Sequence, residues 1–257
     1  MRYQTLSCEM NEGVAVIHIG GPVPGPATIT QLADELGDVC TEITSSGNTR
    51  VVILEGTGEK AFCLQDHSVV SVSEEDTEPS VLSRSIAEPI AKLELPVIAA
   101  IRGDALGQGL ELALACDIRI CTEASHFGFP DIKSGLIPWD GGTQRLPRVV
   151  GKAKAIEMIL TGERIDAREA LRVGLVNRVV SSGDLESVAM KMAQDMASRA
   201  PIAVRYAKET VCKGMDLTLD QGLYLESDLY LLLHTTKDRT EGIQAFREKR
   251  TPKFEGT

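Results

Sequence analysis

The stretch from residue 96 to residue 123, "PVIAAIRGDALGQGLELALACDIRICTE", carries most of the information about the fold. Its first part (96–103) and its last part (117–123) are rich in β-branched residues and are typical of buried strands. Between them, Gly107 and Gly109 lead into an apolar run of Leu and Ala that predicts a helix. The stretch therefore predicts a strand, a glycine-rich turn, a helix and a second strand, which is an α/β arrangement.

One carboxylate, Glu111, stands inside this apolar run with Leu110 and Leu112 on either side. The first turn of a helix has unpaired N–H groups and favours negative charge, so Glu111 could simply face solvent there. The other interpretation is a buried acid, because burial raises a carboxyl pKa towards the range that is useful for proton transfer. The helix residues alone leave both interpretations open.

Outward from this stretch the same alternation of strands and helices continues. Residues 14–19 ("VAVIHI") and 50–56 ("RVVILEG") predict strands, and apolar residues at helical spacing from 29 to 43 predict a helix capped by Thr28 or Thr30. Downstream, 128–142 predicts a long loop, and Asp166 with Glu169 predicts a capping box for a helix that ends at Gly174. From about residue 196 the chain is helical. Alternation by itself favours a doubly wound sheet.

Composition narrows the class of protein. The 257 residues are 43% hydrophobic, enough for one large core or a core with a small appendage. A net charge of −10 disfavours binding to nucleic acids or to an anionic membrane. No apolar run reaches the roughly 20 residues that span a bilayer, and the first residues lack a signal-peptide pattern. Six scattered cysteines and four scattered histidines predict neither disulfides nor a metal site, and they favour a reducing cytoplasm.

Two further acids are candidates for chemistry. Asp131 follows the next strand and could pair with Glu111, because adding water to a double bond requires an acid and a base. Its alternative is a turn residue after Pro130. For Asp140 we favour an N-cap of the helix that starts near Gly141.

Three other features are ambiguous. Trp139 could belong to the core or to a pocket wall. For His67 a loop residue without a catalytic role is favoured over a general base. The tripeptide "RGD" (102–104) matches an adhesion motif, but a match of three residues carries little information.

Residues 93–180 and 235–254 ("TTKDRTEGIQAFREKRTPKF") resemble the crotonase family, the enoyl-CoA hydratase/isomerase superfamily. Weaker similarity extends to the first strand and to "VVILEGTGEKAFC". The resemblance implies a spiral of β-β-α units followed by a helical C-terminal region that forms trimers, often paired into hexamers. It divides the chain into a catalytic, acyl-CoA-binding core (1–195) and a helical region (196–257) for oligomerisation and part of the CoA site. It implies no cofactor, because coenzyme A is part of the substrate.

Carried over by position, the resemblance implies a role for several residues. The two catalytic acids fall on Glu111 and Asp131, the latter one methylene shorter than the glutamate of hydratases. The backbone N–H donors of an oxyanion hole fall on Asp66 and Gln108, where small residues are usual. Asp140 lies in the loop where some isomerases carry an acid. The substrate and CoA site comprises Leu64, Asp66, His67, Ser68, Gly107, Gln108, Trp139, Lys253 and Phe254, the last two reaching a neighbouring subunit's CoA.

The expected activity is that of an enoyl-CoA hydratase-type lyase, which adds water to an acyl-CoA thioester or removes it while an oxyanion hole holds the enolate. An enoyl-CoA or dienoyl-CoA isomerase, or a hydratase of cyclic dienoyl-CoA, is the alternative within the family. A non-catalytic acyl-CoA-binding protein is the alternative from another class. An RNA-binding family member is disfavoured by the charge of −10.

Overall fold

The computed structural model describes residues 3–20, 26–63 and 85–257. Four residues that the resemblance assigns to the substrate site, Leu64, Asp66, His67 and Ser68, lie outside these ranges, and so does the breaker-rich segment 21–25.

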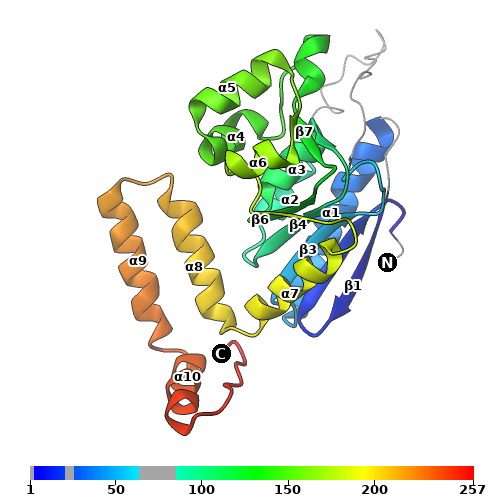
Figure 1. The fold of residues 1–257 in the computed structure, drawn as a ribbon. Helices are drawn as coiled ribbons and strands as arrows, with labels where there is room; N and C mark the ends of the chain where they lie inside the picture. The colour runs from blue at the N-terminus through cyan, green and yellow to red at the C-terminus, as the bar shows by residue number, and fades with distance from the viewer. Residues whose placement is uncertain (1–2, 21–25, 64–84) are drawn as a thin grey trace.

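A six-stranded sheet forms the centre of the molecule (Figure 1). Its strand order is β1-β2-β3-β4-β6-β9, and all neighbours run parallel except the antiparallel pair β1–β2. The strands are β1 (Leu6–Asn11), β2 (Val14–Ile19), β3 (Val51–Gly56), β4 (Val97–Ile101), β6 (Ile118–Thr122) and β9 (Arg178–Val180). The predicted strands at 14–19, 50–56, 96–103 and 117–123 are confirmed.

A second sheet of three short strands lies beside the first, in the order β5 (Ala105–Leu106), β7 (His126–Gly128), β8 (Ile165–Asp166). The chain alternates between the sheets: β4 is followed by β5 and a helix, and β6 by β7 and a short 3-10 helix. This repeated β-β-α unit is the predicted spiral. The doubly wound sheet favoured by alternation alone is wrong, because the second strand of such a unit leaves the main sheet instead of extending it.

The helices of the core are α1 (Pro26–Ser46), α2 (Ala87–Ala91), α3 (Gln108–Ala115), the 3-10 helix η2 (Pro130–Ser134), α4 (Gly142–Val150), α5 (Lys152–Thr161), α6 (Ala167–Arg172) and α7 (Leu185–Ala197). Alternate strand residues point to opposite faces of the main sheet. Val52 and Leu54 of β3 enter the large core with α1, α2 and α3, whereas Val51 and Ile53 enter a smaller core against α7. The main sheet is therefore buried on both faces, as a parallel sheet requires.

Three helices continue beyond α7 and project away from the sheets as an arm (Figure 1): α8 (Pro201–Gly214), α9 (Leu219–Leu233) and α10 (Lys237–Glu248). Lys208 ties α8 to the core, because its Nζ donates to the carbonyl oxygen of Leu95 at 2.8 Å and to Asp117 Oδ2 at 2.7 Å. Among the described residues, no helix is both long enough and apolar enough to cross a membrane.

Three local predictions need correction or refinement. Helix α1 begins at Pro26, so Thr28 and Thr30 lie within the helix and not at its N-cap position. The predicted loop 128–142 contains η2. The Asp166 side chain caps α6 as predicted, but the Glu169 carboxylate bonds to Arg172 and not back to the cap, so only half of the capping box forms.

Candidate active site

The glycine pair of the central stretch starts helix α3 at the junction of the two sheets. Gly107 has φ +52° and ψ −125°, a backbone shape that residues with a Cβ rarely adopt. Its N–H donates to the carbonyl oxygen of Gly128 on β7 at 3.0 Å, which anchors the turn to the small sheet. Helix α3 then runs through the interior, and all eight of its residues are buried.

Glu111 is therefore a buried acid and not a solvent-facing one, with 1% of its surface exposed. Its Oε1 accepts two hydrogen bonds of 2.8 Å, from the main-chain N–H groups of Asp140 and Gly142. Both groups lie at the start of α4, so the beginning of one helix binds the buried carboxylate of another, α3. The second oxygen, Oε2, takes part in neither bond.

Burial raises the pKa of Glu111 to about 7. The loss of hydration is the largest cause, since it penalises the charged form. The hydrogen bonds from Gly142 and Asp140 act in the opposite direction, and the negative charges of Asp140 and Asp131 raise the pKa further. A carboxyl that titrates near neutrality can both accept and release a proton at working pH.

Asp140 belongs to the segment before α4 and is also buried, at 5% exposure. Its Oδ1 accepts from the Ser85 hydroxyl, and its Oδ2 accepts from the N–H groups of Ile86 (2.9 Å) and Ala87 (3.1 Å). Asp140 therefore anchors the start of α2, and the prediction that it caps the helix near Gly141 is wrong: α4 has no side-chain cap. Burial raises the pKa of Asp140, while the bonds from Ser85, Ala87 and Ile86 oppose that rise.

Gly142 is packed so closely that only glycine fits. A Cβ there would lie 2.8 Å from carbon atoms of Phe129 and Pro138, and 2.9 Å from Glu111 Oε1. The absence of a side chain lets the main chain approach the carboxylate.

Two further predicted site residues lie close to this centre. Asp131, half-buried at the start of η2, is near enough for its charge to raise the pKa of Glu111. Gln108 is the first residue of α3, with 5% of its surface exposed. The structure thus brings Glu111, Asp131, Asp140 and Gln108 to one region around the N-terminal turn of α3.

Trp139 lies on the same loop and is 45% exposed, next to the exposed Leu136 and Ile137. It is therefore not a core residue. The loop presents apolar side chains outward, while its main-chain N–H groups at Asp140 and Gly142 point to Glu111.

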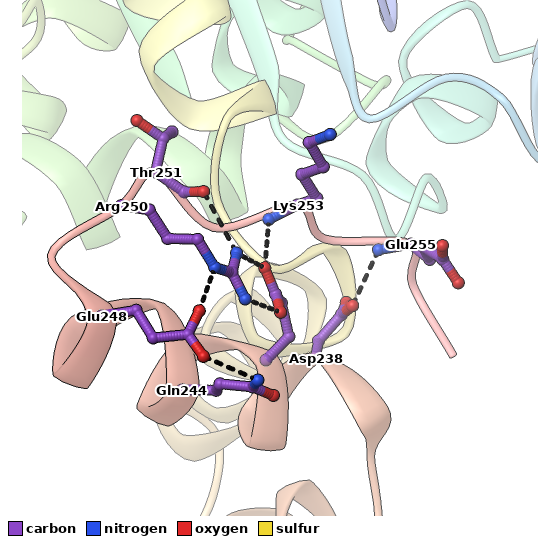
Figure 2. Close-up of polar contacts among 8 residues, drawn as sticks. Asp238, Gln244, Glu248, Arg250, Thr251, Lys253 and Glu255 are labelled. Carbon is purple, nitrogen blue, oxygen red and sulfur yellow. Dashed lines mark hydrogen bonds and ion pairs between the residues drawn. The ribbon is translucent and has the colours of Figure 1, made fainter.

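Lys253 and Phe254 belong to the C-terminal tail, which lies beside α10 and away from α3 within the same chain (Figure 1). Figure 2 shows how the tail is held: Arg250 pairs with both oxygens of Glu241, and Glu241 also accepts from the Lys253 N–H at 2.7 Å. The buried Asp238 accepts from the N–H groups of Glu255 and Gly256. The Lys253 ammonium group points away from this cluster (Figure 2).

Sequence reasoning missed three contributors to the centre: Ser85, Gly142 and Arg145, whose guanidinium donates to the Asp140 carbonyl oxygen at 2.8 Å. The pair Gly141–Gly142 before a predicted helix repeats the signal seen at Gly107 and Gly109, and could have indicated a second close main-chain approach. Ser85 carries no comparable signal.

The remaining polar candidates stand apart from this centre. Arg102 and Asp104 of the "RGD" tripeptide bond to Ser182 and His126 within the chain. All six cysteines are free thiols, four of them buried. In the part of the chain that is described, no group of three His, Cys, Asp or Glu side chains could hold a metal ion.

Known proteins resemble this chain over nearly its whole length. The family model "Enoyl-CoA hydratase/isomerase" matches residues 9–257. The chain is 44% identical to YngF of Bacillus subtilis over 251 residues (96% of each) and 37% identical to a short-chain-enoyl-CoA hydratase of Clostridium acetobutylicum over 260 residues (100% of this chain, 98% of the relative). The crystal structure of an enoyl-CoA hydratase from Bacillus anthracis superposes with a TM-score of 0.90 at 42% identity, covering 99% of this chain and 100% of the other. The fold and the similar proteins agree: the chain belongs to the enoyl-CoA hydratase/isomerase family.

Proposed function

We propose that the protein adds water to the double bond of a 2-enoyl-CoA thioester, or catalyses the reverse elimination. The observation that carries this proposal is Glu111, a carboxyl in the apolar interior with a pKa raised to about 7 and its Oε1 fixed by two main-chain N–H groups. General acid–base catalysis is most efficient when the pKa of the catalytic group lies near the working pH. Relatives named short-chain-enoyl-CoA hydratase and crotonyl-CoA hydratase support the same reaction.

In the proposed mechanism, Glu111 and Asp131 hold the attacking water between them. One carboxylate takes a proton from the water as its oxygen bonds to the β-carbon, and the other acid delivers a proton to the α-carbon. Hydroxide and proton thus add to the same face. The thioester oxygen, which becomes an enolate oxygen in between, would be held by the backbone N–H groups of Gln108 and of Asp66, the latter outside the described residues. No cofactor enters, since the thioester itself acidifies the α-position.

The CoA moiety would be shared between subunits. The arm α8–α10 presents large apolar side chains to solvent, among them Val211, Leu219, Tyr224 and Phe246. We assign this surface to contacts between copies of the chain in a trimer or a hexamer. The C-terminal tail lies away from α3 of its own chain (Figure 1), so its Lys253 and Phe254 would then contact the CoA bound to a neighbouring subunit.

A second candidate is isomerisation of an enoyl- or dienoyl-CoA, favoured by the presence of Asp140 beside Glu111. Because both Asp140 oxygens already accept hydrogen bonds from the start of α2, we rank this reaction below hydration. A non-catalytic binding role ranks lower still, since both positions of the acid pair keep a carboxylate.

The test is a panel of enoyl-, dienoyl- and cyclic dienoyl-CoA thioesters, followed by the loss of enoyl-thioester absorbance and by product analysis. Wild type is expected to hydrate crotonyl-CoA or a longer homologue, and Glu111→Gln to abolish turnover. Glu186→Gln, on the outer helix α7, is the matched control and should leave the rate unchanged. If wild type binds acyl-CoA but converts none of the panel, the protein is a binding module and not an enzyme.

A further inference from the structure

We propose that Asp140 is a positioning residue for Glu111: its carboxylate fixes the loop whose main-chain N–H groups hold the catalytic oxygen. The inference rests on the proposed function in one respect, namely that Glu111 exchanges protons with substrate and water. It assigns to Asp140 a role different from that of a second catalytic acid.

Three parts of Asp140 are fixed at once. The side chain accepts hydrogen bonds from Ser85, Ile86 and Ala87 at the start of α2. The main-chain carbonyl oxygen accepts from Arg145 on α4 at 2.8 Å. The N–H of the residue held at these two points donates to Glu111 Oε1 at 2.8 Å. Helices α2, α3 and α4 therefore meet at this residue.

The same contacts argue against proton transfer by Asp140 itself. Its Oδ1 is engaged by the Ser85 hydroxyl and its Oδ2 by two N–H groups, and the residue is 5% exposed. To exchange a proton with a substrate, the carboxylate would have to release these bonds and leave the Ile86 and Ala87 donors buried without partners, which is costly.

Asp140 also acts on Glu111 through its charge. The charged groups around Glu111 in the described residues are Asp140 in the loop and Asp131 on η2, both of which raise its pKa, and Arg145 on α4, which faces Asp140. On α2, Glu88 pairs with Lys92. Removal of the Asp140 charge therefore lowers the pKa of Glu111 while Asp131 and the burial of the carboxyl remain.

The test compares Asp140→Asn with Asp140→Ala. Asparagine preserves the geometry, because its carbonyl oxygen can accept from Ile86 and Ala87 and its amide can donate to Ser85 Oγ. This variant is expected to keep most of the wild-type kcat, while the limb of the pH–rate profile set by Glu111 moves to lower pH. Alanine removes the anchor, and a misplacement of Glu111 by about 1 Å should lower kcat by about 10²-fold.

Asp166 supplies the matched control, because its carboxylate anchors another short helix, α6, by accepting from the Glu169 N–H at 2.7 Å. Asp166→Asn and Asp166→Ala should alter thermal stability only, with kcat and the pH profile of wild type. If the Asp166 variants lose as much kcat as the corresponding Asp140 variants, the loss is a general effect of helix anchoring, and the proposal is overturned.

Two other outcomes would overturn it. If Asp140→Asn is as inactive as Glu111→Gln, Asp140 exchanges protons itself; if Asp140→Ala is as active as wild type, the loop needs no anchor. A readout independent of turnover is 13C NMR titration of the glutamate carboxyls, with the Glu111 signal identified by its absence from Glu111→Gln. That signal should titrate at lower pH in Asp140→Asn, and an unchanged titration contradicts the proposal even if no enoyl-CoA is converted by wild type.

Discussion

At the scale of single residues, Glu111 combines two properties that rarely occur together. It is surrounded by apolar side chains of α3, and among the described residues its hydrogen bonds come from main-chain N–H groups and not from a cation. A positive partner would lower the pKa, whereas two neutral donors fix the carboxylate and still allow the pKa to rise to about 7.

This arrangement predicts that the ionised carboxylate costs stability. The pKa of Glu111 is about 7 in the folded protein against 4.5 in the unfolded chain. Between these values the folded state binds more protons than the unfolded state, so the free energy of unfolding falls as pH rises from about 4.5 through 7. Glu111→Gln has no carboxyl to ionise and lacks this loss. The free energy of unfolding of Glu111→Gln minus that of wild type should therefore be larger at pH 8 than at pH 4, by up to about 3 kcal/mol.

Urea denaturation of both proteins at the two pH values measures this difference, and groups common to both cancel. A stability difference that is the same at pH 4 and pH 8 would mean that the Glu111 carboxyl titrates alike in the folded and unfolded states.

At the scale of elements, the start of α4 is the part of the fold that tolerates least change. Gly142→Ala would place a Cβ 2.9 Å from Glu111 Oε1 and 2.8 Å from carbon atoms of Phe129 and Pro138. Overpacking of this kind costs about 1–3 kcal/mol, and displacement of the carboxylate should lower kcat by about 10²-fold. Gly37→Ala is the control, because Gly37 lies inside α1 with nothing within 4 Å of its added Cβ.

Gly37→Ala should raise the free energy of unfolding by about 0.5–1 kcal/mol and keep full activity. Thermal melts and crotonyl-CoA kinetics on the two variants check both statements. If Gly142→Ala is as active as wild type, the close approach of the main chain at this position has no role in holding the acid.

Elements with strong local signals could be predicted from the sequence. The strands β2, β3, β4 and β6 follow from β-branched runs, and α3 follows from a glycine pair and an apolar stretch. The partner of Asp140 could not be predicted, because Ser85, Ile86 and Ala87 lie more than 50 residues away in sequence and meet it only after three helices have packed. For the same reason the sequence predicts that Asp140 caps the nearest helix, α4, whereas in the structure it anchors α2.

At the scale of the whole molecule, the arm α8–α10 leaves large apolar side chains exposed. Phe246 on α10 is 86% exposed and Leu219 on α9 is 78% exposed, although burial of such side chains is worth about 1.5–3 kcal/mol each. Patches of this kind mark association surfaces. The C-terminal tail fastens the arm to the core, since Arg50 donates to the carbonyl oxygens of Ala197 and Phe254.

If the arm forms the contact between copies, Phe246→Asp should shift the protein towards monomers, because it places a charge in an apolar interface. Analytical ultracentrifugation measures the change, with wild type expected as a trimer or hexamer. Leu160→Asp is the control, since Leu160 is 66% exposed on α5, which is not one of the arm helices, and should leave the assembly intact. A monomeric wild type would contradict the assignment of this surface.

In the loop before α4, the main chain and the side chains have different roles. Its N–H groups at Asp140 and Gly142 hold the acid, while Leu136, Ile137 and Trp139 project outward. Mutation replaces side chains and leaves N–H groups in place, so these three outward positions are open to variation without loss of the fixed carboxylate. If these side chains border the acyl group of the proposed substrate, single substitutions here would change acyl preference while the acid stays fixed, a starting point for both divergence in nature and directed evolution.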